Sequence, residues 1–128
     1  MIYIDSSVAL ARLLLAPRVP PQPFWQEQLV SSRLLEYEIW NRVHAYGLVR
    51  SHAEEARVLL MGVELVEMDR PVLARALEPL PLAVRTLDAL HLATIDFLST
   101  RGEAVALASY DNRLLAAAHA LGIPVAAL

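Results

Sequence analysis

Short apolar runs alternate with amphipathic segments along the whole chain. Apolar runs bounded by polar or turn residues indicate buried strands, and apolar positions three or four residues apart indicate helices. The expected strands are residues 1–5, 29–31, 63–66, 103–109 and 124–128. The expected helices are residues 8–15, 24–28, 33–46, 51–61, a segment capped by Asp69, 86–100 and 111–121. This alternation predicts an α/β fold, a three-layer α/β/α sandwich built on a parallel central sheet.

Polar residues at the expected helix starts provide the local signals for this assignment. Ser6 or Ser7 can cap the first helix, and Thr86 can cap the longest one. Ser51 and Glu54 stand three residues apart, as in a capping box. No repeat, linker or low-complexity tract interrupts the pattern, so we expect residues 1–128 to form a single domain.

Four acidic residues lie where such a fold can bring them to one place. Asp5 ends the first apolar run, Glu38 follows the second within two helical turns, Asp88 lies just inside a helix, and Asp111 follows the run 105–110. Residues just past the carboxyl ends of parallel strands line a common crevice. Carboxylates crowded together need protons or cations, and hard divalent cations prefer oxygen ligands. The pattern favours a metal-dependent phosphodiesterase site, and the alternative is four unrelated surface acids.

Composition narrows the class of protein further. The hydrophobic fraction of 56% exceeds the usual ~45–50%, which suggests an additional buried surface such as a homodimer interface. The chain has no cysteine, so a metal site must use oxygen or imidazole ligands. No uncharged run is long enough to span a bilayer, and Asp5 interrupts the first apolar run, so we expect a cytoplasmic protein without a signal peptide.

The charge balance leaves nucleic acid open as a partner. The net charge is −3, and all 11 basic residues are arginine, whose planar guanidinium suits phosphate. Codon bias in a GC-rich genome is an alternative reason for the missing lysine. Setting aside the four crevice acids leaves 10 of the 14 acidic residues against 11 arginines. An acidic isoelectric point therefore does not exclude RNA, provided that cations fill the site.

Several other families that cluster acids at strand ends fit poorly. The chemistry of receiver domains resembles that of families that require a lysine, and haloacid-dehalogenase-like phosphatases also use one. This chain has no lysine. A von Willebrand-type metal site needs serine at the position of Ala9. The chain has neither a glycine-rich phosphate loop nor a Gly-x-Ser-x-Gly elbow, so nucleotide kinases and serine hydrolases are also poor fits.

The chain resembles the PIN-domain ribonucleases and, within them, the VapC-type toxins of toxin–antitoxin modules. The order and spacing of several motifs carry this resemblance over nearly the whole chain. They are Ile2 to Ser7, Ser32 with Glu38, Leu87 to Thr94, Ser109 to Leu114, and Leu121 to Val125. The segment from 50 to 81 matches only in general character.

The resemblance implies a function and a set of partners. It implies an endoribonuclease in which Asp5, Glu38, Asp88 and Asp111 form the catalytic metal cluster, with Mg²⁺ or Mn²⁺ as the cofactor. It also implies an RNA substrate, a homodimer and a cognate antitoxin, which we expect to place a basic residue in the crevice and to dock in an apolar groove beside it. The alternatives are a PIN nuclease of RNA processing without an antitoxin and a catalytically inactive PIN module that only binds a partner.

Residues beside the four acids are candidates for supporting roles. Ser7 is a candidate for contact with a metal-bound water, although a helix cap would explain it equally. Asn112 neighbours Asp111 and is a candidate phosphate contact or a turn residue. Arg85 and Arg113 flank the acidic motifs and are candidates for RNA phosphate contacts or ordinary surface arginines. His91 is interpreted as a packed or hydrogen-bonded histidine and not as a metal ligand.

Overall fold

A parallel sheet forms the middle layer of the computed structural model, which describes residues 1–128. Its strands are β1 (Ile2–Ile4), β2 (Leu29–Ser32), β3 (Glu64–Val66) and β4 (Ala106–Ala108), and their order across the sheet is β3–β2–β1–β4. All neighbouring strands run parallel. Ile2 of β1 pairs with Leu29 on one side and Ala106 on the other, so the central strand joins early and late parts of the chain.

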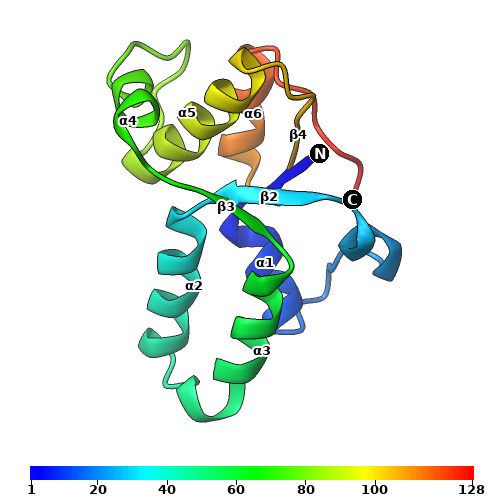
Figure 1. Ribbon diagram of the computed structural model, residues 1–128. Coiled ribbons are helices and arrows are strands. Elements are labelled where there is room, and N and C mark those ends of the chain that lie inside the picture. Colours follow the sequence, from blue (N-terminus) through cyan, green and yellow to red (C-terminus); the bar gives the residue numbers. More distant parts are fainter.

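Helices cover both faces of this sheet. They are α1 (Ser6–Leu13), α2 (Leu34–Ala45), α3 (Val49–Met61), α4 (Arg70–Ala76), α5 (Thr86–Thr100) and α6 (Asn112–Ala120), with a short 3₁₀ helix η1 (Gln22–Gln26). In Figure 1, α1, α2 and α3 lie on one side of the sheet and α4, α5 and α6 on the other. The three layers confirm the predicted α/β/α architecture. No helix combines the length and apolar character needed to cross a membrane.

The core consists of two apolar clusters separated by the sheet. Ile4 packs in the cluster on the side of α1 to α3, whereas Tyr3 packs in the cluster on the side of α5 and α6. Successive side chains of a strand point to opposite faces, so the central β1 contributes to both clusters. Both residues have no exposed surface. The rigidity of β1 therefore extends to the residue that follows it, Asp5.

The structure corrects several predicted helix starts. Helix α1 begins at Ser6, with Asp5 as its N-cap, so the prediction that Ser6 or Ser7 caps it was wrong. Helix α3 already begins at Val49, so Ser51 is not an N-cap, and its hydroxyl instead contacts the carbonyl of Leu48 and the ring of its neighbour. Both helices therefore begin two residues before their expected starts at residues 8 and 51.

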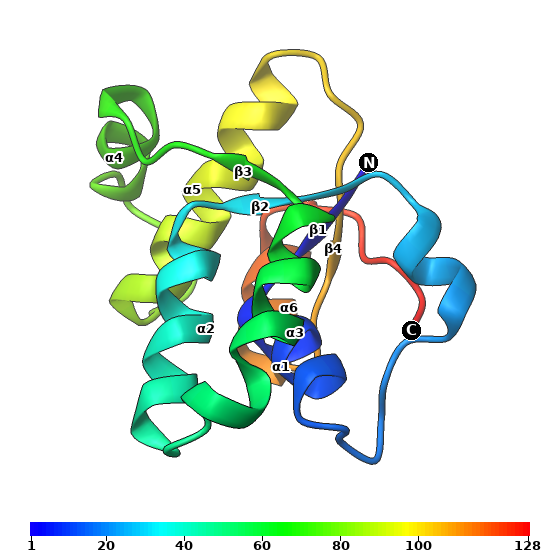
Figure 2. The same cartoon turned by 60° about the horizontal axis from the view of Figure 1, so that its bottom comes forward.

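Other caps and the last strand also differ from expectation. Asp69 stands at the N-cap of α4 without a side-chain hydrogen bond, and Thr86 is the first residue of α5 and not its cap. The strand expected over 124–128 is a single bridge between Val125 and Leu107. This segment lies at the edge of the sheet, beside β4, where Val125 is half exposed. Figure 2 shows the protein from a second direction, with both termini on the same side.

Candidate active site

The structure brings Asp5, Glu38, Asp88 and Asp111 together around one pocket of about 550 Å³. Asp5 follows the carboxyl end of β1, and Asp111 lies three residues beyond β4. Glu38 projects from α2, which follows β2, and Asp88 projects from α5. The pocket thus lies at the carboxyl edge of the parallel sheet, where such folds usually bind ligands.

Three of the four carboxylates stand at helix N-termini. Asp5 is the N-cap of α1, and Asp111 is the N-cap of α6, where its Oδ1 accepts the backbone N–H groups of Arg113 at 2.9 Å and Leu114 at 3.4 Å. Asp88 lies in the first turn of α5. The positive ends of the three helix dipoles therefore stabilise negative charge in this pocket.

Asp5 is the most buried of the four acids and the most firmly held. Its side chain is almost inaccessible, with 4% of the residue surface exposed. Ser7 donates to Oδ1 at 2.6 Å and Ser109 donates to Oδ2 at 2.7 Å. Burial raises the pKa of Asp5 above its usual range, and the hydrogen bonds from Ser7 and Ser109 oppose that rise. The carboxylate is therefore fixed in position but costly to ionise without a cation.

Glu38 is held by two side chains from other elements. Ser6 of α1 donates to Oε2 at 3.1 Å, and His91 of α5 contacts Oε1 through Nε2 at 2.6 Å. The other ring nitrogen of His91, Nδ1, lies 2.6 Å from the hydroxyl of Tyr3, which accepts the backbone N–H of Ser32 at 3.1 Å. Burial raises the pKa of the Tyr3 hydroxyl above its usual range, so this group remains protonated.

Arg85 supplies a positive charge between two of the acids. Its Nε lies 3.4 Å from Oδ2 of Asp88, and one of its terminal nitrogens lies 3.2 Å from Oδ2 of Asp111. The Arg85 side chain is 63% exposed, so it is free to move without disturbing the core. In this arrangement one guanidinium neutralises part of the charge that crowds the pocket.

The remaining candidates lie at different distances from the pocket. Ser7 lines it and binds Asp5, as described above. Arg113 is exposed and lines an adjoining depression together with Arg85 and Asp88. Asn112 is exposed at the start of α6 and does not line the pocket. His91 is buried and hydrogen-bonded, which agrees with its interpretation as a packed residue.

The donor set of the pocket fits a hard divalent cation, because all four acids offer carboxylate oxygens. The side chains are nevertheless not arranged as a finished metal site, since no three of the chain's acidic and histidine side chains are grouped to hold an ion. Arg85 bridges Asp88 and Asp111, and Glu38 is turned toward Ser6 and His91. A cation held by the Oδ2 atoms of Asp88 and Asp111 would take the place of Arg85.

Sequence reasoning missed several residues that hold the acids in place. Ser6 and Ser109 each stand within two residues of a site acid, and that adjacency was a usable signal. The contacts of Tyr3 and His91 connect residues 88 and 53 positions apart in the sequence, and no local pattern reports them. Arg42 also lines the pocket, one helical turn beyond Glu38.

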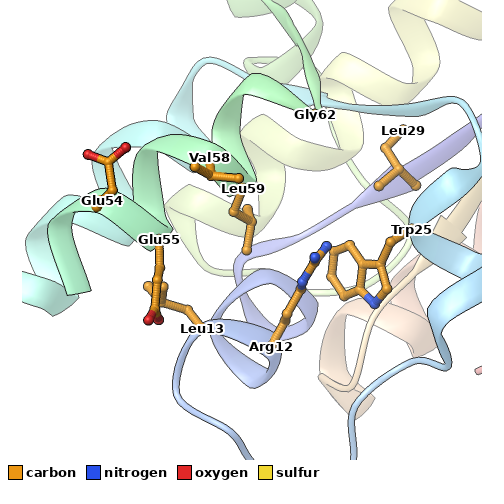
Figure 3. Close-up of a pocket in the computed structure, with 9 residues that line it drawn as sticks. All are labelled: Arg12, Leu13, Trp25, Leu29, Glu54, Glu55, Val58, Leu59 and Gly62. Atoms are coloured by element: carbon orange, nitrogen blue, oxygen red, sulfur yellow. The ribbon is translucent and has the colours of Figure 1, made fainter. Parts of the chain in front are cut away.

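Two further concave surfaces lie near α1. A largely apolar groove of about 440 Å³ shares Ser7 and Leu10 with the carboxylate pocket and is bordered by Tyr110 and Arg18, whose guanidinium lies 4.9 Å from the tyrosine ring. A second groove, of about 480 Å³, lies between α1 and α3, where Arg12 stacks on Trp25 (Figure 3). None of the four site acids lines this second groove.

Comparison with known proteins places the chain in a family. The family model described as "PIN domain" matches residues 2–125. Ribonuclease VapC47 from Mycobacterium tuberculosis is 31% identical over 98% of this chain and 96% of its own length. Ribonuclease VapC46 from the same species is 36% identical over the same shares of the two chains.

A solved structure supports the same fold. A chain of a toxin–antitoxin complex from Klebsiella pneumoniae superposes with a TM-score of 0.61 over 91% of both chains, at 15% identity. At that identity the likeness concerns the fold alone. With the match of the family model to nearly the whole chain and the two VapC relatives, it follows that this protein belongs to the PIN-domain family, in its VapC branch.

Proposed function

We propose that the protein is a Mg²⁺- or Mn²⁺-dependent endoribonuclease and the toxin of a toxin–antitoxin pair, acting in the cytoplasm. One observation carries the proposal: four carboxylates from distant parts of the chain line one pocket in a protein whose relatives are named ribonucleases. An apolar ligand pocket would not need this charge, and a purely structural cluster would not remain open to solvent.

The residues of the pocket have different roles, which depend on how firmly each side chain is held in place. Asp5, Glu38, Asp88 and Asp111 would hold the divalent cation, which when bound supplies an activated water and charge stabilisation for phosphodiester hydrolysis. Asp5 provides the fixed reference point because Ser7 and Ser109 hold both of its oxygens. Ser7 therefore helps to fix the position of the Asp5 carboxylate.

Arginines near the pocket suit the substrate's phosphates. Arg85 already contacts two carboxylates, and its exposed guanidinium can turn toward a phosphate once a metal ion neutralises those acids. Arg113 lies on the adjoining depression and offers a second guanidinium beyond the pocket. Contacts of this kind fix the backbone of the RNA and carry no base preference.

Apolar surfaces outside the core are the candidate binding sites for the antitoxin and for a second copy of the chain. The groove beside the pocket suits an antitoxin segment, which would deliver a basic residue to the carboxylates while covering the apolar surface. Large apolar side chains are exposed on α2 at Tyr37, at the C-cap of α2 at Tyr46, and on α3 at Val58 and Met61, the last at 86%. This face suits a second copy of the chain in a homodimer.

The decisive experiment is a cleavage assay on single-stranded RNA with purified protein. We expect cleavage with Mn²⁺ or Mg²⁺, loss of cleavage with EDTA, and loss in the Asp5→Asn variant, which keeps the shape of the side chain but removes its charge. Mapping the cut ends before and after the substitution separates the activity from contaminating nucleases. Cleavage that survives both EDTA and Asp5→Asn would refute the proposal.

The same assay separates the alternatives. An inactive PIN module would bind a partner without cleaving any RNA in the presence of metal. A nuclease of RNA processing would cleave, but no protein encoded by a neighbouring gene would inhibit it. Co-purification with a small DNA-binding protein that blocks cleavage identifies the toxin.

A further inference from the structure

Glu38 differs from the other three acids in how it is placed. It lies within α2, away from any helix N-terminus, and it has the longest and most flexible of the four side chains. Its position in the pocket therefore depends on the groups that touch it, which are Ser6 and His91. The contact with His91, at 2.6 Å, is the shorter of the two.

His91 is itself held by Tyr3, which contacts the ring nitrogen that does not face Glu38. Only 2% of its surface is exposed, and its Nδ1 lies 2.6 Å from the hydroxyl of Tyr3, which has no exposed surface. The two rings pack edge to face, with centroids 5.7 Å apart. Tyr3 lies on the central strand and does not line the pocket. The imidazole therefore cannot turn without breaking a buried contact with the most rigid part of the sheet.

The hydrogen bonds from Ser32 through Tyr3 and His91 to Glu38 can all donate in the same direction. A backbone N–H only donates, so the Ser32 N–H donates to the Tyr3 oxygen, and the Tyr3 O–H remains free to donate to Nδ1 of His91. An ionised Glu38 only accepts, so Nε2 of His91 carries a hydrogen and donates to Oε1. This arrangement satisfies every polar atom of both rings and fixes the tautomer of His91.

We propose that Tyr3 and His91 form a buried relay of hydrogen bonds that positions Glu38 for binding a divalent cation. The inference rests on the proposed function. His91 acts on the metal site through Glu38, as hydrogen-bonded partners of metal ligands commonly do. Tyr3 acts one step further away, from a residue that touches neither the pocket nor any of the four acids.

A purely structural role for the two rings predicts something different. Buried polar groups need hydrogen-bond partners, so removing the Tyr3 hydroxyl would lower stability in either case. Under a structural role the folded protein would still bind metal with its normal affinity. Metal affinity of the folded protein, measured separately from stability, therefore distinguishes the two roles.

The experiment measures Mn²⁺ affinity by isothermal titration calorimetry on chelator-stripped protein, with folding checked by circular dichroism. The variants are Tyr3→Phe, which deletes one oxygen, His91→Leu, and His91→Gln, which keeps a hydrogen-bond donor. Ile95→Val is the control, because it removes one methyl group from a fully buried side chain on the same helix as His91. It perturbs the packing of the cluster that contains Tyr3 but removes none of the hydrogen-bonding atoms of the relay.

We expect His91→Leu to weaken Mn²⁺ binding about 10- to 100-fold, the range found when a partner of a metal ligand is lost. Tyr3→Phe should weaken it less, His91→Gln should retain part of the affinity, and Ile95→Val should bind as the unmodified protein does. In a Glu38→Gln background, Tyr3→Phe should have no further effect, because the relay then has no carboxylate to position.

Three outcomes would overturn the inference. If folded Tyr3→Phe and His91→Leu bind Mn²⁺ normally, the relay is structural only. If their losses are as large in the Glu38→Gln background, they do not act through Glu38. If the unmodified protein does not bind Mn²⁺ at all, the inference fails together with the metal-dependent part of the proposed function.

Discussion

Replacing Arg85 by glutamine should strengthen metal binding, although the variant removes a residue from the site. The guanidinium contacts Asp88 at 3.4 Å and Asp111 at 3.2 Å, and a divalent cation at the same carboxylates must displace it. Glutamine keeps much of the side-chain length and removes the charge. The metal-free site would then lose a competitor, while the four carboxylates stay in place.

The size of the effect follows from the exposure of the arginine. Because the Arg85 side chain is 63% exposed, each ion pair contributes only about 0.2–1 kcal/mol. Losing both on metal binding costs roughly 0.4–2 kcal/mol, and about 1.4 kcal/mol corresponds to a tenfold change in affinity. The Arg85→Gln variant should therefore bind Mn²⁺ roughly 2- to 30-fold more tightly.

Calorimetric titration of chelator-stripped protein at low ionic strength measures this difference directly. The gain should shrink as salt rises, because exposed ion pairs are screened. Arg113→Gln is the matched control, since it removes the same charge from the adjoining surface and Arg113 makes no ion pair with the acids. Unchanged or weaker Mn²⁺ binding by Arg85→Gln, or an equal gain in Arg113→Gln, would refute the competition.

Other consequences of the site and the fold can be measured independently. With metal present, Arg85→Gln should weaken binding of single-stranded RNA and lower the slope of log affinity against log salt by about 0.7, the value for one phosphate contact; an unchanged slope would exclude that contact. In EDTA, Asp5→Asn should stabilise the protein: the raised pKa of buried Asp5 gives a contribution to stability that is present at acid pH and is lost as pH rises through that pKa. Its melting temperature should thus exceed that of the unmodified protein by more at pH 7 than at pH 4, and a pH-independent difference would contradict this. Millimolar Mg²⁺ or Mn²⁺ should raise the melting temperature, and Asp5→Asn should remove most of that gain. Sedimentation should show a dimer that Met61→Glu dissociates, because Met61 is almost fully exposed on α3, and a monomeric unmodified protein would remove this argument.

The pattern of apolar and polar residues predicted the architecture, because each main strand and helix is long or apolar enough to be recognised from that pattern. Helix α5 has the bounds expected from sequence, Thr86 to Thr100. The start of α1 was misplaced, since Asp5, Ser6 and Ser7 are all good caps in succession and only the length of β1 selects among them. A strand end set by sheet pairing is not encoded in the residues that follow it.

The candidate site could be predicted in part for the same reason. Strand ends locate the four acids, and the structure places all of them around one pocket. Their detailed arrangement depends on contacts across the fold, such as Arg85 with Asp111 and His91 with Glu38. Such contacts form between residues that no local spacing relates, so the arrangement of side chains in the pocket could not be predicted from the sequence.

The order of strands across the sheet has a consequence for synthesis of the protein. The first strand, β1, lies between β2 and β4, and β4 is the last strand along the chain. A nascent chain that has emerged only as far as β3 carries Asp5 and Glu38 but neither Asp88 nor Asp111. The pocket is assembled only when the final quarter of the chain leaves the ribosome and β4 pairs with β1. An unfinished chain therefore lacks the complete carboxylate pocket, and any activity that needs all four acids can begin only after β4 has joined the sheet.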